Sequence, residues 1–258
     1  MRLTTIGTGT VAPSPKRVCA GVLIEFGAVR LLLDCGSGVT HRMAALGIDW
    51  MGITHLAITH FHPDHVSDIP ILLMAWRYGA MPPRVEPIEV LGPPGTANLM
   101  ERLADAYGQW MREPGYPLTV REIPFGEHTA LPGQAYLGTY KVPHTEESIA
   151  YSIECGGSRL VYTGDTGFDK GLAEWSAGCK VILSECSLPS SMAVAGHMTP
   201  EECGALGALA RPDLLALTHF YPPVELEQIA GIVGDYYKGP LALATDGWWT
   251  QIEDSACS

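Results

Sequence analysis

The sequence predicts a mixed α/β fold in which two β-sheets lie together and helices cover their outer faces. Short β-rich runs bounded by glycine dominate the first part of the chain, and helical and strand-like patterns alternate after it. A meander followed by β/α alternation is typical of two sheets with helices packed outside them, rather than of one parallel sheet. The 258 residues contain no linker-like stretch, so we expect a single domain over residues 1–258.

The elements follow in chain order. The meander is predicted from three β-rich runs, two of which join through a tight Gly27-Ala28 connection: Leu3–Ile6, Val18–Phe26 and Val29–Asp34. Periodic apolar spacing then predicts helices at Val39–Leu46, Ile69–Tyr78, Ala97–Met111, Lys170–Ser176 and Pro200–Ala210. Further strands are predicted at His55–Thr59, Ile88–Leu91, Leu118–Ile123, Ala135–Val142, Ala150–Cys155, Leu160–Thr163, Val181–Ser184, Leu214–Leu217 and Leu241–Ala244.

Composition excludes several classes of protein. The formal net charge is −12, and no cluster of Lys and Arg forms a stripe that would follow a phosphate backbone, so we expect no extended nucleic-acid surface. No apolar run is long enough to cross a bilayer, and the first residues lack the apolar core of a signal peptide. Seven cysteines with no C-x-x-C pair suit reduced thiols, so we expect a cytoplasmic protein without membrane partners.

One hexapeptide carries the sharpest chemical signal, His60-Phe61-His62-Pro63-Asp64-His65, with four candidate metal ligands in six residues. In an extended turn, His60 and His62 point the same way because side chains alternate, while Asp64 and His65 lie beyond Pro63 and face elsewhere. The hexapeptide therefore suits two ions rather than one. Imidazole and carboxylate ligands with few thiols favour Zn²⁺ or a similar borderline cation.

Other candidate ligands stand where apolar strands end. His60, Asp165, His219 and Asp246 each follow a short apolar run. Sites gather at the carboxyl-terminal edges of such strands, because rigid strands aim the side chains and the loops leave room for a ligand. We expect Asp165 and His219 to join the hexapeptide, and the strand-end position alone gives Asp246 the same standing.

Three further residues each allow two interpretations. His144 follows a predicted strand and is either a ligand or an ordinary surface histidine. His197 precedes a predicted helix N-cap at Thr199 and is either catalytic or an ordinary loop residue. Glu185 ends a very apolar strand, so its carboxylate must be paired or functional because burying an unpartnered charge is costly. Asp68, three residues after His65, either orients a ligating histidine or stabilises a helix N-terminus.

These residues, in this order, resemble the metallo-β-lactamase superfamily and, within it, the ribonuclease Z-like branch. The H-x-H-x-D-H motif, the later His144, Asp165 after Thr-Gly and the final His219 form the superfamily pattern. Three features resemble ribonuclease Z in particular: the opening Ile6-Gly-Thr-Gly-Thr with Pro13 and Arg17, the Leu33-Asp34-Cys35-Gly36 turn, and the pair of Glu185 with His197. The resemblance implies an αββα sandwich with a two-metal site at one edge of its β layers.

The resemblance also implies a role for each candidate residue. His60, His62 and His144 would hold one divalent ion, Asp64, His65 and His219 the other, and Asp165 would bridge both. The superfamily pattern gives Asp246 no metal, which implies a structural role for it. The ions would be Zn²⁺, with Mn²⁺ or Fe²⁺ accepting the same ligands. A hydroxide shared by the ions would attack, oriented by Asp64, while His197 protonates the departing oxygen and Glu185 fixes its tautomer.

One departure from the ribonuclease Z pattern determines which substrate we expect. Ribonucleases Z usually carry a long tRNA-gripping arm between the positions of His144 and Asp165, where this chain has room for one strand hairpin. We therefore expect a dinuclear phosphodiesterase that acts on a small or short phosphodiester, as a homodimer. The alternatives are hydrolysis of another ester class, such as a lactone, thioester, aryl sulfate or β-lactam, and 3′ processing of tRNA precursors.

Overall fold

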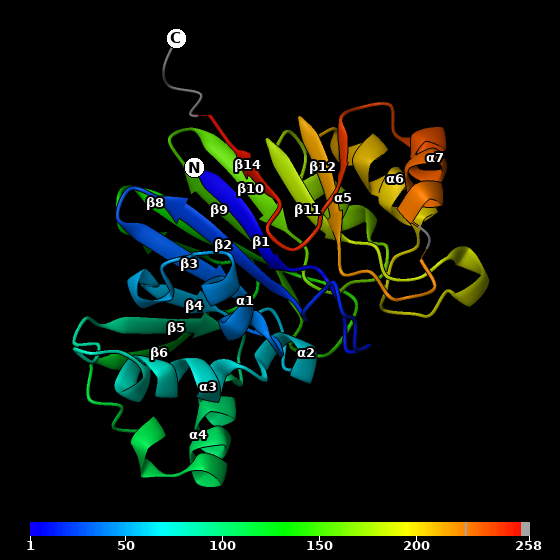
Figure 1. Cartoon of the computed structure of the whole chain (residues 1–258). Coiled ribbons are helices and arrows are strands. Elements are labelled where there is room, and N and C mark those ends of the chain that lie inside the picture. The colour runs from blue at the N-terminus through cyan, green and yellow to red at the C-terminus, as the bar shows by residue number, and fades with distance from the viewer. Residues whose placement is uncertain (225, 254–258) are drawn as a thin grey trace.

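Two β-sheets packed face to face form the centre of the protein in the computed structural model, which describes residues 1–224 and 226–253. Helices cover the outer face of each sheet, so the layers run α, β, β, α (Figure 1). This confirms the predicted four-layer sandwich. Among the described residues, no helix is both long and apolar enough to cross a membrane.

The first sheet has seven strands in the order β14-β1-β2-β3-β4-β5-β6. β1 is antiparallel to both of its neighbours, while β3, β4, β5 and β6 run parallel. Met1 also donates from its amino group to the carbonyl of Ile252 at 2.9 Å, so the two ends of the described chain meet at this edge. The strands are β1 Arg2–Gly7, β2 Gly21–Phe26, β3 Val29–Leu33, β4 His55–Ala57, β5 Ile88–Gly92, β6 Leu118–Glu122 and β14 Trp249–Gln251.

The second sheet also has seven strands, in the order β13-β12-β11-β10-β9-β8-β7. Its first four strands are parallel, and β7 to β10 form an antiparallel meander. The strands are β7 His128–Leu131, β8 Ala135–Lys141, β9 Ile149–Cys155, β10 Ser158–Tyr162, β11 Val181–Glu185, β12 Leu214–Thr218 and β13 Leu241–Leu243.

Three apolar layers hold the sandwich together. The middle layer joins the two sheets through side chains such as Leu31 and Tyr151, both fully buried. The outer layers lie between each sheet and its helices, with Trp76 in the first and Leu206 in the second. The helices are α1 Val39–Ala45, α2 Pro63–Val66, α3 Ile69–Met74, α4 Thr96–Tyr107, α5 Lys170–Trp175, α6 Pro200–Ala210 and α7 Leu226–Tyr236.

The structure corrects the sequence prediction at several element boundaries. The predicted helix Ile69–Tyr78 is α3 followed by a π-helical turn over Ala75–Gly79, and the predicted helix Ala97–Met111 is α4 followed by a 3₁₀ turn over Gln109–Met111. The predicted strand Val18–Phe26 begins only at Gly21. Four strands and α-helices were not predicted at all: the short edge strands β7 and β14 and the helices α2 and α7.

Candidate active site

The candidate ligands lie in loops that leave both sheets at the same end of the sandwich. His60 follows β4 of the first sheet, whereas His144, Asp165 and His219 follow β8, β10 and β12 of the second. Pro63 begins the short helix α2, which turns Asp64 and His65 inward while His62 stays exposed. The hexapeptide thus divides between two directions, as its spacing predicts, although a helical turn rather than an extended one produces the division.

The seven candidate ligands form two clusters that share one carboxylate. Ligand atoms of each cluster lie within 4.8 Å of one another: His60, His62, His144 and Asp165 in the first cluster, and Asp64, His65 and His219 in the second. Oδ2 of Asp165 faces the first cluster, at 3.8 Å from Nε2 of His60 and 3.9 Å from Nε2 of His144. Oδ1 faces the second, at 3.2 Å from His65 and 3.3 Å from His219. Asp165 therefore lies where a bridging ligand would.

Several of these atoms are buried without a hydrogen-bond partner. In the described part of the chain they include Nε2 of His60, His65 and His219 and Oδ1 of Asp165. Buried polar atoms are nearly always paired, because leaving one unpaired costs about 1 to 3 kcal/mol. Unpaired imidazole nitrogens around a shared carboxylate are the ligand set that a divalent cation satisfies, so these residues fit a pair of ions.

Neighbouring groups fix how four of the five candidate histidine ligands are presented. Nδ1 of His144 donates to the carbonyl of Gly196 at 2.8 Å, and Nδ1 of His65 lies 2.7 Å from Oδ2 of Asp34. Nδ1 of His60 and His219 lie 3.0 Å from the hydroxyls of Thr59 and Ser187. In each case Nδ1 is engaged, which leaves Nε2 for a cation and orients the ring.

Asp34 is a supporting residue that the sequence analysis did not identify. It lies just after β3, is fully buried and has a left-handed backbone with φ of 59°. Besides His65, its carboxylate accepts from the backbone N–H of Thr59 at 2.8 Å and from the hydroxyl of Tyr162 at 3.0 Å. One carboxylate therefore connects both sheets directly beneath the second cluster. The sequence offered one indication of this role, the Asp34-Cys35-Gly36 turn, which the sequence analysis used only as a feature of the ribonuclease Z-like resemblance.

His197 and Glu185 form a pair beside the clusters. Nδ1 of His197 lies 2.9 Å from Oε1 of Glu185, and the imidazole rings of His197 and His144 are 4.8 Å apart between centroids. Glu185 is also held by the backbone N–H of Thr166 at 2.7 Å and by the hydroxyl of Ser187 at 2.5 Å. Thr199 caps α6 with a capping box, as predicted, and thereby fixes the loop that carries His197.

The charges of these groups shift one another's pKa values. Burial alone would lower the pKa of His65, but the carboxylates of Asp165 and Asp34 outweigh it and raise that pKa well above its usual range. Burial also disfavours the carboxylate of Asp165, yet His219 and His65 lower its pKa well below the usual range. The site therefore favours ionised carboxylates in its centre, as cation binding requires.

The pKa values of His197 and Glu185, the pair beside the clusters, are both raised. Burial would lower the pKa of His197, but the hydrogen bond to Glu185 outweighs it and raises that pKa. Burial raises the pKa of Glu185, and the hydrogen bond from His197 offsets this rise only in part. His197 thus keeps its proton to a higher pH than a free imidazole does, which suits a general acid.

Two acidic residues of the sequence analysis lie outside both clusters. Asp68 occupies the N-cap position of α3 without a side-chain capping bond, and its Oδ2 accepts instead from the backbone N–H of Thr40 in the first turn of α1 at 2.9 Å, so its carboxylate stabilises a helix N-terminus, the second of its two interpretations. Asp246 accepts from the backbone N–H groups of Thr8 and Val18 and pairs with Arg42 at 3.3 Å. Its role is structural, as expected.

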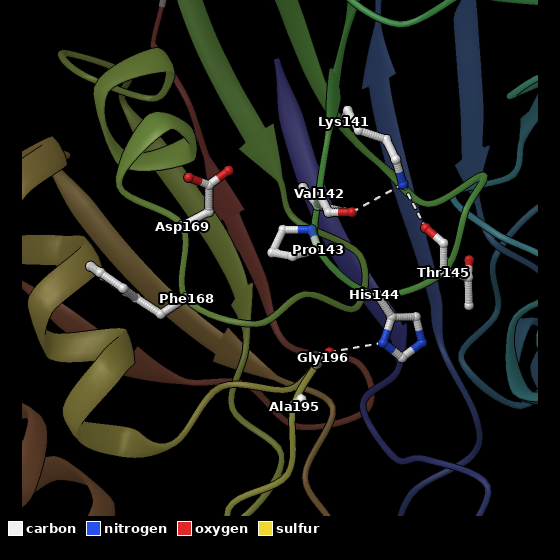
Figure 2. A pocket seen from close by; sticks show the side chains of 9 residues that line it. All are labelled: Lys141, Val142, Pro143, His144, Thr145, Phe168, Asp169, Ala195 and Gly196. Carbon is white, nitrogen blue, oxygen red and sulfur yellow. Dashed lines mark hydrogen bonds between the residues drawn. The ribbon is translucent and has the colours of Figure 1, made fainter.

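Two cavities flank the clusters. One, of about 720 Å³, lies beside His144 and is bounded by the loops after β8 and β10 and by Gly196 (Figure 2). The other, of about 410 Å³, lies beside Asp64 and is bounded by residues of the loop between β1 and β2. A substrate thus has room on either side of the ligand clusters.

Comparisons with known proteins agree with this geometry. The β-lactamase superfamily domain matches residues 29–220. Ribonuclease Z of Mycobacterium bovis is 28% identical over 275 residues, which cover 95% of this chain and 96% of that protein. The metallo-β-lactamase fold protein YhfI of Bacillus subtilis superposes with a TM-score of 0.82 at 21% identity, covering 96% of this chain and 98% of YhfI. The short form of human tRNase Z gives a TM-score of 0.79 at 22% identity, covering 98% and 100%.

The superfamily match spans most of the chain and includes every residue of both clusters. The solved structures share the sandwich over nearly their whole length. The chain therefore belongs to the metallo-β-lactamase superfamily, and its relatives place it in the ribonuclease Z-like branch.

Proposed function

We propose that the protein is a dinuclear metal-dependent phosphodiesterase that acts on a small or short phosphodiester. One observation carries this proposal: the two carboxylate oxygens of Asp165 face the two ligand clusters, and the His197–Glu185 pair stands directly beside them. The clusters supply places for two cations, and the pair supplies a proton donor. Both are needed to cleave an ester whose leaving oxygen departs as an alkoxide.

The ligands we propose are His60, His62 and His144 for one ion and Asp64, His65 and His219 for the other, with Asp165 between them. Two cations, when bound, would neutralise the charge of a phosphodiester and lower the pKa of an attacking water. Zn²⁺ is our choice because imidazole dominates the donor set, although Mn²⁺ and Fe²⁺ accept the same donors.

The chain's own residues would perform the remaining steps. Asp64 would orient the attacking water, because its buried carboxylate lies 3.5 Å from Nε2 of His219 and faces the clusters. His197 would then give a proton to the leaving oxygen as the phosphorus–oxygen bond breaks. Glu185 would hold the Nδ1 proton of His197 and stabilise the imidazolium form, so that the proton to be transferred sits on Nε2.

A short substrate is favoured over a folded RNA by the chain between His144 and Asp165. This interval contains only the β9–β10 hairpin, which pairs within the second sheet and leaves no projecting segment. The net charge of −12 opposes a long polyanion as well. A cyclic or short nucleotide needs only the local charge of the two ions.

A second candidate function is the 3′ processing of tRNA precursors. The observation that favours it is the length of the match to ribonuclease Z of M. bovis, 95% of this chain and 96% of that protein. The two functions use the same chemistry and differ in the surface that the substrate contacts. A lactone, thioester, aryl sulfate or β-lactam would use the same clusters without needing His197 as an acid.

A panel of substrates tests these alternatives. The metal-loaded protein is assayed with bis(p-nitrophenyl) phosphate, a cyclic nucleotide (whose leaving group is an alkyl oxygen), a tRNA precursor, an acyl lactone, an acyl thioester, an aryl sulfate and a cephalosporin, together with the variants His197→Ala and Asp165→Asn. We expect turnover of the diester, a loss of at least about 100-fold in kcat for His197→Ala with an alkyl leaving group, and no turnover for Asp165→Asn. Turnover of the lactone but not the diester, with His197→Ala fully active, would refute the phosphodiesterase.

The organisation of the chain supports three lesser proposals. Residues 1–258 would act as one hydrolase domain, since β14 pairs with β1 and joins the end of the chain to its beginning. The protein would work in the cytoplasm, where thiols such as those of Cys35 and Cys186 stay reduced. A homodimer remains our prediction for its assembly, and sedimentation analysis would test it.

A further inference from the structure

The cavity beside His144 is the larger of the two that flank the clusters, at about 720 Å³ against about 410 Å³. Its floor is the segment Val142–Thr145 after β8, and Gly196 closes one side (Figure 2). Phe168 and Asp169, from the loop before α5, lie across the cavity from His144 (Figure 2). The same loop carries Asp165, but neither Phe168 nor Asp169 was a candidate residue in the sequence.

The loop that carries His197 also forms one wall of this cavity. Ala195 and Gly196 line it, and His197 is the next residue. The carbonyl of Gly196 accepts from Nδ1 of His144 at 2.8 Å, which ties the wall to the first ligand cluster. A group bound in this cavity would therefore lie beside the loop that carries His197. The smaller cavity, beside Asp64, does not include this loop among its walls.

The cavity offers surface for an uncharged group, and the one cation in its lining is already hydrogen-bonded to the backbone. Phe168 is 37% exposed, and Pro143 and Ala195 add apolar surface. Lys141 is the one cation among the lining residues, and its ammonium donates to the carbonyls of Thr145 at 2.5 Å and Val142 at 3.2 Å. Burial also lowers the pKa of Lys141.

The carboxylate of Asp169 faces the same space and would repel an anion. It accepts from the hydroxyl of Tyr140 at 3.1 Å and from the backbone N–H of Gly171 at 2.7 Å. Its charge has no cationic partner among these contacts. The charges of Asp169 and Lys141 offset each other, so a second phosphate on the group that occupies this cavity would meet a nearby carboxylate and find no excess positive charge to hold it.

We propose that this cavity is the leaving-group subsite and that it takes an uncharged alcohol with an aromatic or heterocyclic ring, such as a nucleoside. The inference rests on the proposed phosphodiesterase function and names the half of the substrate that occupies the cavity. In the reaction, water gives one proton to solvent as its oxygen bonds to phosphorus, the bond from phosphorus to the alcohol oxygen breaks, and the proton of His197 goes to that oxygen. The free alcohol then leaves from the cavity, with its ring against Phe168.

The experiment compares Phe168→Ala with Phe168→Tyr, which keeps a ring, and with Tyr136→Ala, which removes an exposed aromatic from β8 outside the cavity. Steady-state kinetics with bis(p-nitrophenyl) phosphate give KM and kcat, and added adenosine serves as the alcohol product. Saturation-transfer NMR with the metal-free protein measures adenosine and adenosine 5′-monophosphate binding without any turnover.

We expect Phe168→Ala to raise KM about 3- to 10-fold with little change in kcat, the loss expected when one aromatic contact is removed. Competitive inhibition by adenosine and its NMR signal should be lost with it. Phe168→Tyr should restore both, and Tyr136→Ala should change neither. In the metal-free protein, adenosine should bind more strongly than its monophosphate.

Two results would overturn the subsite while leaving the phosphodiesterase intact. The first is an unchanged KM and unchanged adenosine inhibition in Phe168→Ala, in a protein that still cleaves the diester. The second is stronger binding of the monophosphate than of adenosine to the metal-free protein. If no diester is cleaved at all, the proposed function fails, and the NMR comparison still decides whether the cavity binds an uncharged ring.

Discussion

Oδ2 of Asp34 and Nδ1 of His65 lie 2.7 Å apart in a fully buried contact beneath the second ligand cluster. The same carboxylate also holds Thr59 and Tyr162. His65 is thereby fixed with Nε2 toward Asp165, which makes its orientation depend on a residue 31 positions earlier in the chain.

Asp34→Asn should weaken binding of the second cation by about 10- to 100-fold, because the amide cannot hold His65 as firmly as the carboxylate does. Isothermal titration with Zn²⁺ measures the change, and the ion count per chain should fall toward one at limiting metal. Asp213→Asn, which removes an exposed carboxylate paired with Lys180, is the matched control. Two ions bound with unchanged affinity in Asp34→Asn would show that Asp34 does not orient the ligand.

This contact also shows what the sequence leaves open. The sequence shows where apolar runs, and therefore strands, end. Because His60, His219 and Asp165 each follow such a run, the sequence predicted that these side chains would come together at one edge of the sheets. The partners of these ligands depend on tertiary pairing: Leu33 lies opposite Ala57 in the parallel β3–β4 pair, and that register places Asp34 beside Thr59. The sequence does not state this register, so Asp34 and Ser187 escaped notice. The roles of the predicted ligands stay predictions until metal is measured.

The missed elements have local reasons. α7 contains Gly231 and Gly234, each of which costs about 1 kcal/mol in helix propensity and weakens the helical pattern. β7 and β14 are short edge strands with mostly exposed or half-buried residues, so they lack the apolar alternation that marks a strand. The buried strands of the second sheet have continuous apolar runs in the sequence, and those strands were predicted.

Removing metal should abolish activity and lower thermal stability while the fold persists. A chain of this length buries enough apolar surface to fold without an ion. Ions bound at 100 times their Kd would add about 2.7 kcal/mol each to the free energy of unfolding, and a chelator would remove that contribution. Circular dichroism with and without EDTA tests this, with Zn²⁺ added back as the control. Loss of the far-ultraviolet signal on chelation would show that the ions are needed for folding.

Glu185→Gln should move the alkaline limb of the kcat profile to lower pH. His197 acts as an acid only while protonated, and the carboxylate of Glu185 raises its pKa. Without that negative charge, His197 loses its proton at a lower pH, so activity falls earlier as the pH rises. The measurement is kcat against pH with an alkyl leaving group, and Glu174→Gln, on an exposed face of α5, is the control. An unshifted limb would mean that His197 is not the titrating acid.

Ser187→Ala should impair the site through two neighbours at once. The Ser187 hydroxyl lies 2.5 Å from Oε2 of Glu185 and 3.0 Å from Nδ1 of His219. It therefore links Glu185, which holds the proposed proton donor His197, to a proposed ligand of the second cluster. A hydroxyl has one proton to donate, and the short distance assigns it to Glu185. The Ser187 oxygen then accepts from Nδ1 of His219, which leaves Nε2 of that ring for the cation.

Without this oxygen, Nδ1 of His219 loses its acceptor and the ring can turn, so the second cation should bind several-fold more weakly and kcat should fall. Raising the Zn²⁺ concentration should recover only the part of the loss that comes from metal binding. Ser187→Thr keeps the hydroxyl and should restore affinity, and Ser191→Ala, on an exposed turn, should behave as the unaltered protein. If Ser187→Ala matches the unaltered protein in both Zn²⁺ affinity and kcat, the link from Glu185 through Ser187 to His219 contributes neither to metal binding nor to catalysis.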